Sequence, residues 1–375
     1  MKKFAVYSLL ALLLFVVLFL LCVSRSGIKK TIKEALKAPL KTESLSERRD
    51  YVITMPQPGE KKKQYNYSIY LIKADASGNT MWIRSYSTGN NDWAEAVYSL
   101  DDGGAIVAAR SYSPEEGYLG MYVLKVGPDG GKISLTWLND VKEGELKEKS
   151  GDCVITAGRA YTGGAAGGVY IAGTGKDGNY KWVRNFGSGY FEWGYTALWV
   201  KDGHYVTIAQ DDDPSIANED FVIVQRDSQG KYDWTRRFGG DKFDRGYSIE
   251  PVKSGGFIAA GLTYSYGAGN DDAYIIRLDD DGAKIWEKYY GMQGHDRAYD
   301  AVEAPDGGFL VAGTTDSTGA GNYDAYIIKL DADGNLIWQK TFGGVFDDTA
   351  HAIAVTNDNG FIAAGATDSY PPEKL

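Results

Sequence analysis

The chain has 375 residues, with 47 glycines, ten prolines and a formal net charge of −10. This length accommodates one large all-β domain, and the abundant glycine suits short strands joined by tight turns, which argues against a helical bundle or a disordered chain. The first 50 residues carry +6, so residues 51–375 carry −16, a charge that repels phosphate backbones and argues against nucleic acid as a partner.

Residues 1–26 are predicted to be a membrane anchor or signal segment. The run from Phe4 to Ser24 is almost entirely apolar, and a helix of this length reaches about 31 Å, enough to span a bilayer core. An uncleaved transmembrane helix is favoured because signal peptides usually have shorter apolar regions. The alternatives are a signal cleaved after Ser24 or Ser26 and a lipoprotein with its lipid on Cys22.

Residues 27–64 are predicted to form a short basic helix and a polar linker. The helix covers Ile28 to Leu36 and ends before Pro39. Its lysines outnumber those that precede the apolar run, so the positive-inside rule favours a domain that faces the cytoplasm. The resemblance described below implies the opposite orientation, and the sequence leaves this conflict open.

Residues 65–370 repeat a unit of about 50 residues, a period typical of β-propeller blades. The clearest copy runs from Asp324 to Trp338, Trp82 anchors a first copy, and a copy from Met121 to Trp137 is imperfect. The tryptophans of four copies are spaced 52 residues apart, at Trp182, Trp234, Trp286 and Trp338. We expect each repeated tryptophan to pack between neighbouring blades.

Each unit is predicted to contain four strands, joined by Asp-Gly and Gly-Gly turns that supply the positive φ of tight hairpins. In one unit the strands are Ala298–Ala304, Phe309–Gly313, Ala325–Leu330 and Leu336–Phe342. The first strand of the third blade, placed within Asn139–Ser150, has the weakest pattern.

The two ends of the repeat region are incomplete units. The domain begins with strands of the third and fourth type, at Ser68–Lys73 and Met81–Tyr86, and ends with strands of the first and second type, at Ala350–Thr356 and Phe361–Ala366. Each half alone leaves an unpaired sheet edge. Joined, they complete one blade, so the sequence predicts an all-β, six-bladed β-propeller closed by its N-terminal and C-terminal strands, with a tail at 371–375.

The string GGFLVAGTTDSTGAGNYDAYIIKLDADGNLIWQKTFGG at residues 307–344 resembles the repeat of β-propeller proteins on bacterial and archaeal cell surfaces. Its Leu-Asp-x-x-Gly-x-x-x-Trp portion resembles, more loosely, the blades of quinoprotein-like propellers. Many such proteins have no assigned activity. The resemblance implies an extracytoplasmic binding or scaffold module, at the cell surface or facing the periplasm, and it carries over no catalytic residues.

An acidic residue stands at the start of the first strand in five units. These residues are Asp92, Glu192, Asp244, Asp296 and Asp347. With a quinoprotein-like strand order they form a ring at one mouth of a central channel, able to hold Ca²⁺. The alternative, favoured because the acid recurs in most units, is that each carboxylate bonds nearby backbone N–H groups.

The residue after each acid varies between units, and such variation marks a candidate ligand site. It is Trp93, Trp193, Arg245, Arg297 or Asp348, and the loops of the same face add Tyr112, Tyr264, Tyr266 and Tyr323. Aromatic faces beside polar groups suit sugar rings, which offer apolar C–H faces and hydroxyls together. The sequence therefore predicts a glycan or protein ligand on this loop face.

Enzymatic interpretations have less support. The alternative is a sialidase-like six-bladed hydrolase acting on surface glycans, for which Arg245 and Arg297 fit part of an arginine cluster. A third equivalent arginine and the aspartate-box spacing are missing, and the three histidines show no zinc-ligand spacing. No P-loop, dinucleotide motif or Ser-His-Asp context occurs, so the sequence predicts no catalytic residues and no cofactor other than Ca²⁺.

Overall fold

The computed structural model describes residues 67–113, 117–137, 153–161, 167–175, 180–186, 197–200, 204–210, 220–227 and 231–375. They lie in a compact unit that spans Gln64–Leu375. The predicted membrane segment at 1–26, the linker at 27–64 and the strand within Asn139–Ser150 lie outside the described residues. Among the residues described, no helix has the length and apolar character needed to cross a membrane.

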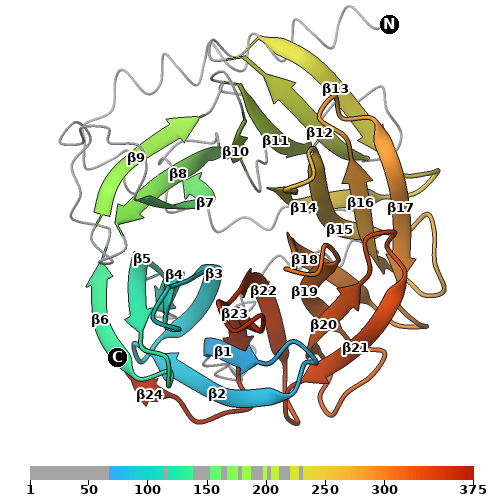
Figure 1. Ribbon diagram of the computed structural model, residues 1–375. Coiled ribbons are helices and arrows are strands. Elements are labelled where there is room, and N and C mark those ends of the chain that lie inside the picture. Colours follow the sequence, from blue (N-terminus) through green and yellow to red (C-terminus); the bar gives the residue numbers. More distant parts are fainter. Residues whose placement is uncertain are drawn as a thin grey trace, which may run out of the picture. The chain divides into compact units, whose positions relative to one another are not determined.

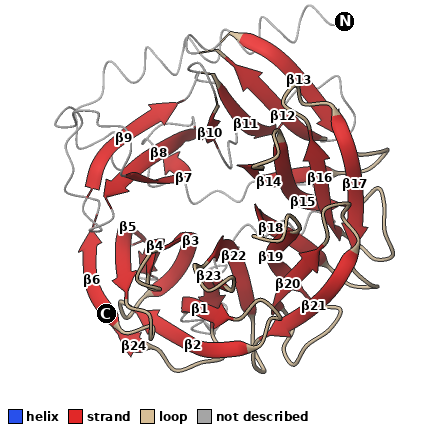
Figure 2. Cartoon of the chain, in the orientation of Figure 1, coloured by secondary structure: helices blue, strands red, loops and turns tan. Residues whose placement is uncertain are grey.

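The described elements are all β-strands, arranged in six sheets (Figures 1 and 2). One sheet contains β3 (Asn91–Ser99), β4 (Ala105–Ser113), β5 (Gly117–Val126) and β6 (Lys132–Trp137). The next contains β7 (Cys153–Tyr161), β8 (Gly167–Gly175) and β9 (Tyr180–Phe186). A third contains β10 (Ala197–Trp199), β11 (Tyr205–Gln210), β12 (Phe221–Arg226) and β13 (Tyr232–Phe238).

Two further sheets repeat the same antiparallel order with little variation. They contain β14 (Asp244–Pro251), β15 (Phe257–Thr263), β16 (Asp272–Leu278) and β17 (Lys284–Tyr290), and β18 (Asp296–Glu303), β19 (Phe309–Thr315), β20 (Asp324–Leu330) and β21 (Leu336–Phe342). The second and third strands are buried along their whole length, as expected for strands covered on both faces. These strands form the core.

The sixth sheet joins the two ends of the repeat region. It contains β22 (Asp348–Val355), β23 (Phe361–Thr367), β1 (Ser68–Ala74), β2 (Thr80–Ser87) and β24 (Glu373–Lys374). β1 pairs with β23 over all seven of its residues, from Ser68 opposite Thr367 to Ala74 opposite Phe361. The predicted pairing of N-terminal with C-terminal strands is confirmed.

The C-terminal tail extends this sheet, which the sequence did not predict. β24 lies parallel to β2, with Tyr86 opposite Glu373, and the Leu375 N–H donates to the Ser87 carbonyl at 2.8 Å. The tail therefore covers part of a sheet edge that is otherwise open to another strand.

Four of the repeated tryptophans, Trp82, Trp234, Trp286 and Trp338, pack against the next sheet, as predicted. The Trp82 Nε1–H donates to the Pro128 carbonyl at 2.8 Å, and the Trp286 Nε1–H donates to the Ala332 carbonyl at 3.1 Å. Each indole lies beside the turn glycine of that sheet; Gly334, with φ +76°, would bring a Cβ within 3.1 Å of Trp286. Only glycine combines that φ with this close approach.

The first strands of four sheets form a consecutive set, here called the inner strands: β14, β18, β22 and β3. β14 contacts β18, β18 contacts β22, and β22 contacts β3. Figure 1 shows them on the inner side of their sheets. Side chains of these strands can therefore meet across sheets.

Each inner strand is irregular at the same place. Its register with the second strand shifts between Ala94 and Ala96, between Gly246 and Ser248, between Ala298 and Asp300, and between Ala350 and Ala352. One extra residue is inserted at each shift, as in a β-bulge, which bends a strand and redirects a side chain. We call the inserted residues the bulge row: Glu95, Tyr247, Tyr299 and His351.

Candidate functional site

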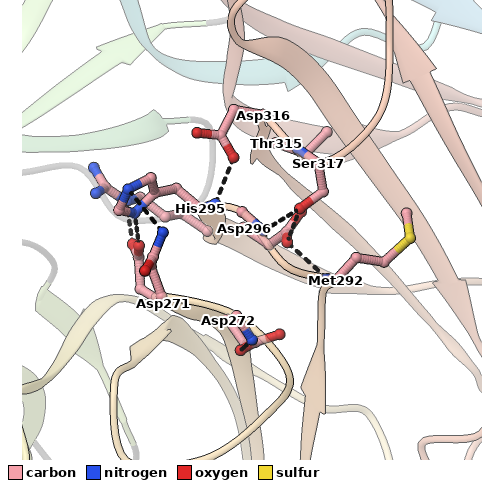
Figure 3. Close-up of polar contacts among 12 residues, drawn as sticks. Asp271, Asp272, Met292, His295, Asp296, Thr315, Asp316 and Ser317 are labelled. Carbon is pink, nitrogen blue, oxygen red and sulfur yellow. Dashed lines mark hydrogen bonds and ion pairs between the residues drawn. The ribbon is translucent and has the colours of Figure 1, made fainter.

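Four buried aspartates fix the starts of the inner strands. Asp92, Asp244, Asp296 and Asp348 are at most 1 % exposed. Each carboxylate accepts the backbone N–H of the residue four positions earlier, at 2.8 or 2.9 Å, from Thr88, Gly240, Met292 and Gly344. Each also accepts a serine hydroxyl, from Ser87, Ser265, Ser317 and Ser369. Figure 3 shows Met292 and Ser317 converging on Asp296.

The structure corrects one member of the predicted acidic set. The position equivalent to Asp296 is occupied by Asp348, and Asp347 lies one residue earlier, half-buried. Asp347 accepts the Tyr67 hydroxyl at 3.4 Å and donates its backbone N–H to Asp368 at 2.8 Å. Burial, and then the neighbouring Asp347, raise the pKa of Asp368 to about 6. Glu192 lies outside the described residues.

These contacts favour the backbone-bonding interpretation of the acids over a Ca²⁺ site. Among the described residues, no three His, Cys, Asp or Glu side chains are grouped so that they could hold a metal ion. We therefore expect the full-length chain, in detergent, to melt within about 1 °C of the same temperature in millimolar Ca²⁺ and in chelator. A Ca²⁺-dependent rise of several degrees would restore the metal interpretation.

A buried carboxylate organises the start of β18. Asp271 is fully buried; one of its oxygens faces His295 Nδ1 and the other accepts the Arg297 Nε–H. The His295 backbone N–H donates to Asp316, and Figure 3 shows Asp271 and His295 directed toward one another. Burial alone would lower the pKa of Arg297, but Tyr299 and Asp271 raise it overall. Arg297 is thus a permanently charged group whose charge is paired inside the protein.

The other predicted residues beside the acids lie in different surroundings. Trp93 is buried, packs in a tilted arrangement against Tyr67 with 5.7 Å between ring centroids, and has the Arg110 guanidinium 4.8 Å above its ring. Arg110 also forms an ion pair with Glu95. Arg245 is half-buried, with its guanidinium 4.7 Å above the Phe243 ring. Trp193 lies outside the described residues.

The predicted loop tyrosines contribute unequally. Tyr264 packs at 5.8 Å against Phe243, and the Tyr323 carbonyl accepts the Asp348 N–H at 2.7 Å. Tyr266 is 41 % exposed, but its ring stacks at 4.8 Å on Tyr289 and its hydroxyl donates to Gly239. Tyr112 is half-buried and pairs through its backbone with Asn91. Tyr264 and Tyr266 therefore lie in one loop, after β15, whereas Tyr112 lies on β4 and Tyr323 directly precedes β20.

Sequence reasoning missed the bulge row. The Tyr247 and Tyr299 rings meet edge to face at 5.1 Å, and Tyr299 meets His351 in the same way at 5.1 Å. His351 Nδ1 lies 3.0 Å from the Ala94 carbonyl, on the next inner strand. All four side chains are half-buried. The one signal in the sequence was that Tyr247, Tyr299 and His351 recur at the 52-residue spacing.

A second missed feature is a pair of carboxyl groups farther along the inner strands. Burial, and then Asp300, raise the pKa of Glu250 to about 8. Asp300 accepts the Ile353 N–H at 2.9 Å and its own strand's Ala301 N–H at 2.9 Å, while burial raises its pKa as well. At neutral pH this pair holds a proton that an exposed pair would release.

Residues 304–336 match a family model described as a domain of unknown function (DUF5122) beta-propeller. Together with the sheets described above, this match supports the resemblance to β-propeller repeat proteins drawn from the sequence, and the matched model has no assigned function. No curated protein matches the chain.

Three solved structures are similar over most of the chain. A eukaryotic initiation factor has 8 % identity and a TM-score of 0.29, over 77 % of this chain and 60 % of its own. A putative 6-phosphogluconolactonase from Bacteroides uniformis has 14 % identity and a TM-score of 0.38, over 78 % and 87 %. A subtype N10 neuraminidase-like protein (A/little yellow-shouldered bat/Guatemala) has 8 % identity and a TM-score of 0.36, over 72 % and 93 %.

The chain spans less than two thirds of the initiation factor's length. Similarity at this level assigns no activity, substrate or partner to the chain.

Proposed function

We propose that the chain is a membrane-anchored, extracytoplasmic binding module whose six sheets are the blades of one closed propeller. The pairing of β1 with β23 supports closure, because it joins the two ends of the repeat region in one sheet. The apolar run from Phe4 to Ser24 supports the anchor. The extracytoplasmic placement rests on the resemblance to cell-surface repeat proteins.

One observation carries the binding role. The buried aspartates and bulges repeat on the inner strands, while the side chains beside them differ from sheet to sheet. Trp93, Arg245 and Arg297 follow equivalent aspartates, and Glu95, Tyr247, Tyr299 and His351 occupy equivalent bulges. A repeated backbone with unlike side chains gives an asymmetric set of groups around the inner strands, and a specific ligand requires such asymmetry. We propose a glycan as that ligand.

The hydrolase alternative has less support. A sialidase-like site needs arginines available to bind a substrate carboxylate, and Arg297 is 4 % exposed and bonded to Asp271. An internal ion pair of this kind positions side chains but leaves little charge for a ligand. The Asp271–His295–Arg297 cluster therefore serves to position side chains at the start of β18.

The proposal is tested by thermal melting of the full-length chain in detergent, against a panel of uncharged and sialylated oligosaccharides. A ligand at about 100 times its Kd stabilises the folded state by about 2.7 kcal/mol. We expect at least one oligosaccharide to raise the melting temperature by several degrees. A panel without any such shift would overturn the glycan-binding role.

A further inference from the structure

The bulge row connects four neighbouring inner strands through side chains. The chain of contacts runs from Tyr247 to Tyr299 to His351, and His351 then reaches the backbone of Ala94, beside Glu95. A bulged residue lies outside the regular strand pairing, so its side chain is not needed for the sheet's ladder. The fold therefore requires the bulge but does not dictate which residue occupies it.

The His351 imidazole has a defined hydrogen-bonding polarity. A carbonyl oxygen can only accept, so Nδ1, 3.0 Å from the Ala94 oxygen, carries the proton. Burial lowers the pKa of His351, which keeps the ring neutral at pH 7. Nε2 is then an acceptor with a lone pair. The neighbouring tyrosine hydroxyls can both donate and accept.

Charges around the bulge row are balanced within the protein. Glu95 pairs with Arg110, and Arg297 pairs with Asp271. Arg297 also interacts with Tyr299, whose pKa is raised by burial and lowered in part by this guanidinium. The row thus offers hydroxyls, an imidazole acceptor and aromatic rings, between two ion pairs that need no external counter-charge.

We propose that Tyr247, Tyr299 and His351, with Glu95 at the end of the row, bind one uncharged sugar residue of the glycan. This deepens and rests on the proposed glycan-binding function. Vicinal sugar hydroxyls donate and accept at once, which matches the tyrosine hydroxyls and His351 Nε2, and the C–H face of a pyranose packs on aromatic rings. A charged sugar would gain no unpaired partner among these groups.

The test uses the full-length chain in detergent and the best uncharged oligosaccharide of the panel, with affinities measured by calorimetry. Y247F and Y299F remove single hydroxyls without changing ring shape, and each lost hydrogen bond weakens binding by about 2- to 10-fold. We expect the double variant to bind about 4- to 100-fold more weakly. Tyr299 also bonds Arg297, so the melting temperature of each variant is measured to separate a loss of ligand contacts from a loss of folded protein. Y98F is the matched control, because Tyr98 lies on β3 but is 42 % exposed and outside the row.

The outcomes separate the two proposals. If the wild-type chain binds the sugar and the double variant binds it equally well, the bulge row is not the site, while the glycan-binding function stands. If the wild-type chain binds no sugar of the panel, the proposed function fails and the sugar assignment of the row fails with it. A loss of affinity confined to sialylated ligands would also overturn the assignment to an uncharged sugar.

Discussion

Deleting residues 67–87 is expected to abolish cooperative unfolding of the whole repeat region. The deletion removes β1 and β2, and four residues of β1 (Ile69, Tyr70, Leu71 and Ile72) have no exposed surface. Burial of each such side chain contributes roughly 1.5–3 kcal/mol, and a typical domain is stable by only about 5–15 kcal/mol. The loss also opens the edge of β23, which then has no strand beyond it.

Circular dichroism and calorimetry of the full-length and deleted chains measure this effect. The matched control removes residues 371–375, which deletes β24. Glu373 and Lys374 are exposed, so this deletion should cost at most about 2 kcal/mol and leave one sharp transition. A sharp transition that survives loss of 67–87 would contradict the joining of the two chain ends.

The second large effect is a dependence of stability on pH caused by Glu250. Its pKa is raised from 4.5 to about 8 in the folded protein, by burial and by Asp300. The folded state therefore holds a proton that the unfolded chain releases. The stability that this bound proton gives to the folded state is fully present below about pH 4.5 and is lost as the pH rises through about 8.

E250Q removes this titration, so the variant should become more stable than the wild type as the pH rises from 5 to 9. One pKa unit corresponds to about 1.4 kcal/mol, and allowing for partial access of water, the gain should be roughly 2–4 kcal/mol at pH 9. The measurement is urea unfolding across this pH range.

E287Q is the control, because its expected effect on the stability of the folded protein has the opposite sign. Burial alone would raise the pKa of Glu287, but bonds from Lys284 and Tyr274 lower it overall. Its ionised form therefore stabilises the folded state above the unfolded pKa, and the variant should be less stable than the wild type at neutral pH.

The prediction for Glu250 is contradicted if the stabilities of the wild type and E250Q change in parallel with pH. That result would show that Glu250 titrates as an exposed carboxyl group.

Most strand positions were predictable because apolar alternation and turn chemistry are local. The strand predicted at Leu336–Phe342 matches β21, and the one predicted at Phe309–Gly313 falls within β19. The imperfect copy from Met121 to Trp137 was harder to align with the others from the sequence. Trp137 pairs with Tyr122 across the sheet, whereas Trp286 pairs with Arg277. Trp137 therefore does not occupy the repeated tryptophan position, and Ser134, which pairs with Lys125, does.

The site was less predictable because it depends on register. Asp347 and Asp348 are adjacent. The burial of Asp348 and its bonds from Gly344 and Ser369 show that Asp348 is the structural acid, in agreement with its 52-residue spacing from Asp296. The bulges at Glu95, Tyr299 and His351 have no glycine or proline beside them, so the sequence gives no sign that Tyr299 and His351 share a row with Glu95. The partner of Arg297 was hidden for a similar reason, since Asp271 belongs to the preceding sheet's loop.

The same geometry explains how one fold can combine stability with variation. The buried aspartates and the tryptophan–turn contacts repeat and hold neighbouring sheets together. The bulge row uses positions that these contacts leave unconstrained.

The most direct measurement is a crystal structure of the full-length chain with the best uncharged oligosaccharide of the panel. We predict one sugar ring in van der Waals contact with Tyr247 and Tyr299, with a hydroxyl donating to His351 Nε2. Sugar density elsewhere on the loop face would keep the binding role and contradict the bulge-row site, and a structure without bound sugar at saturating concentration would contradict glycan binding itself.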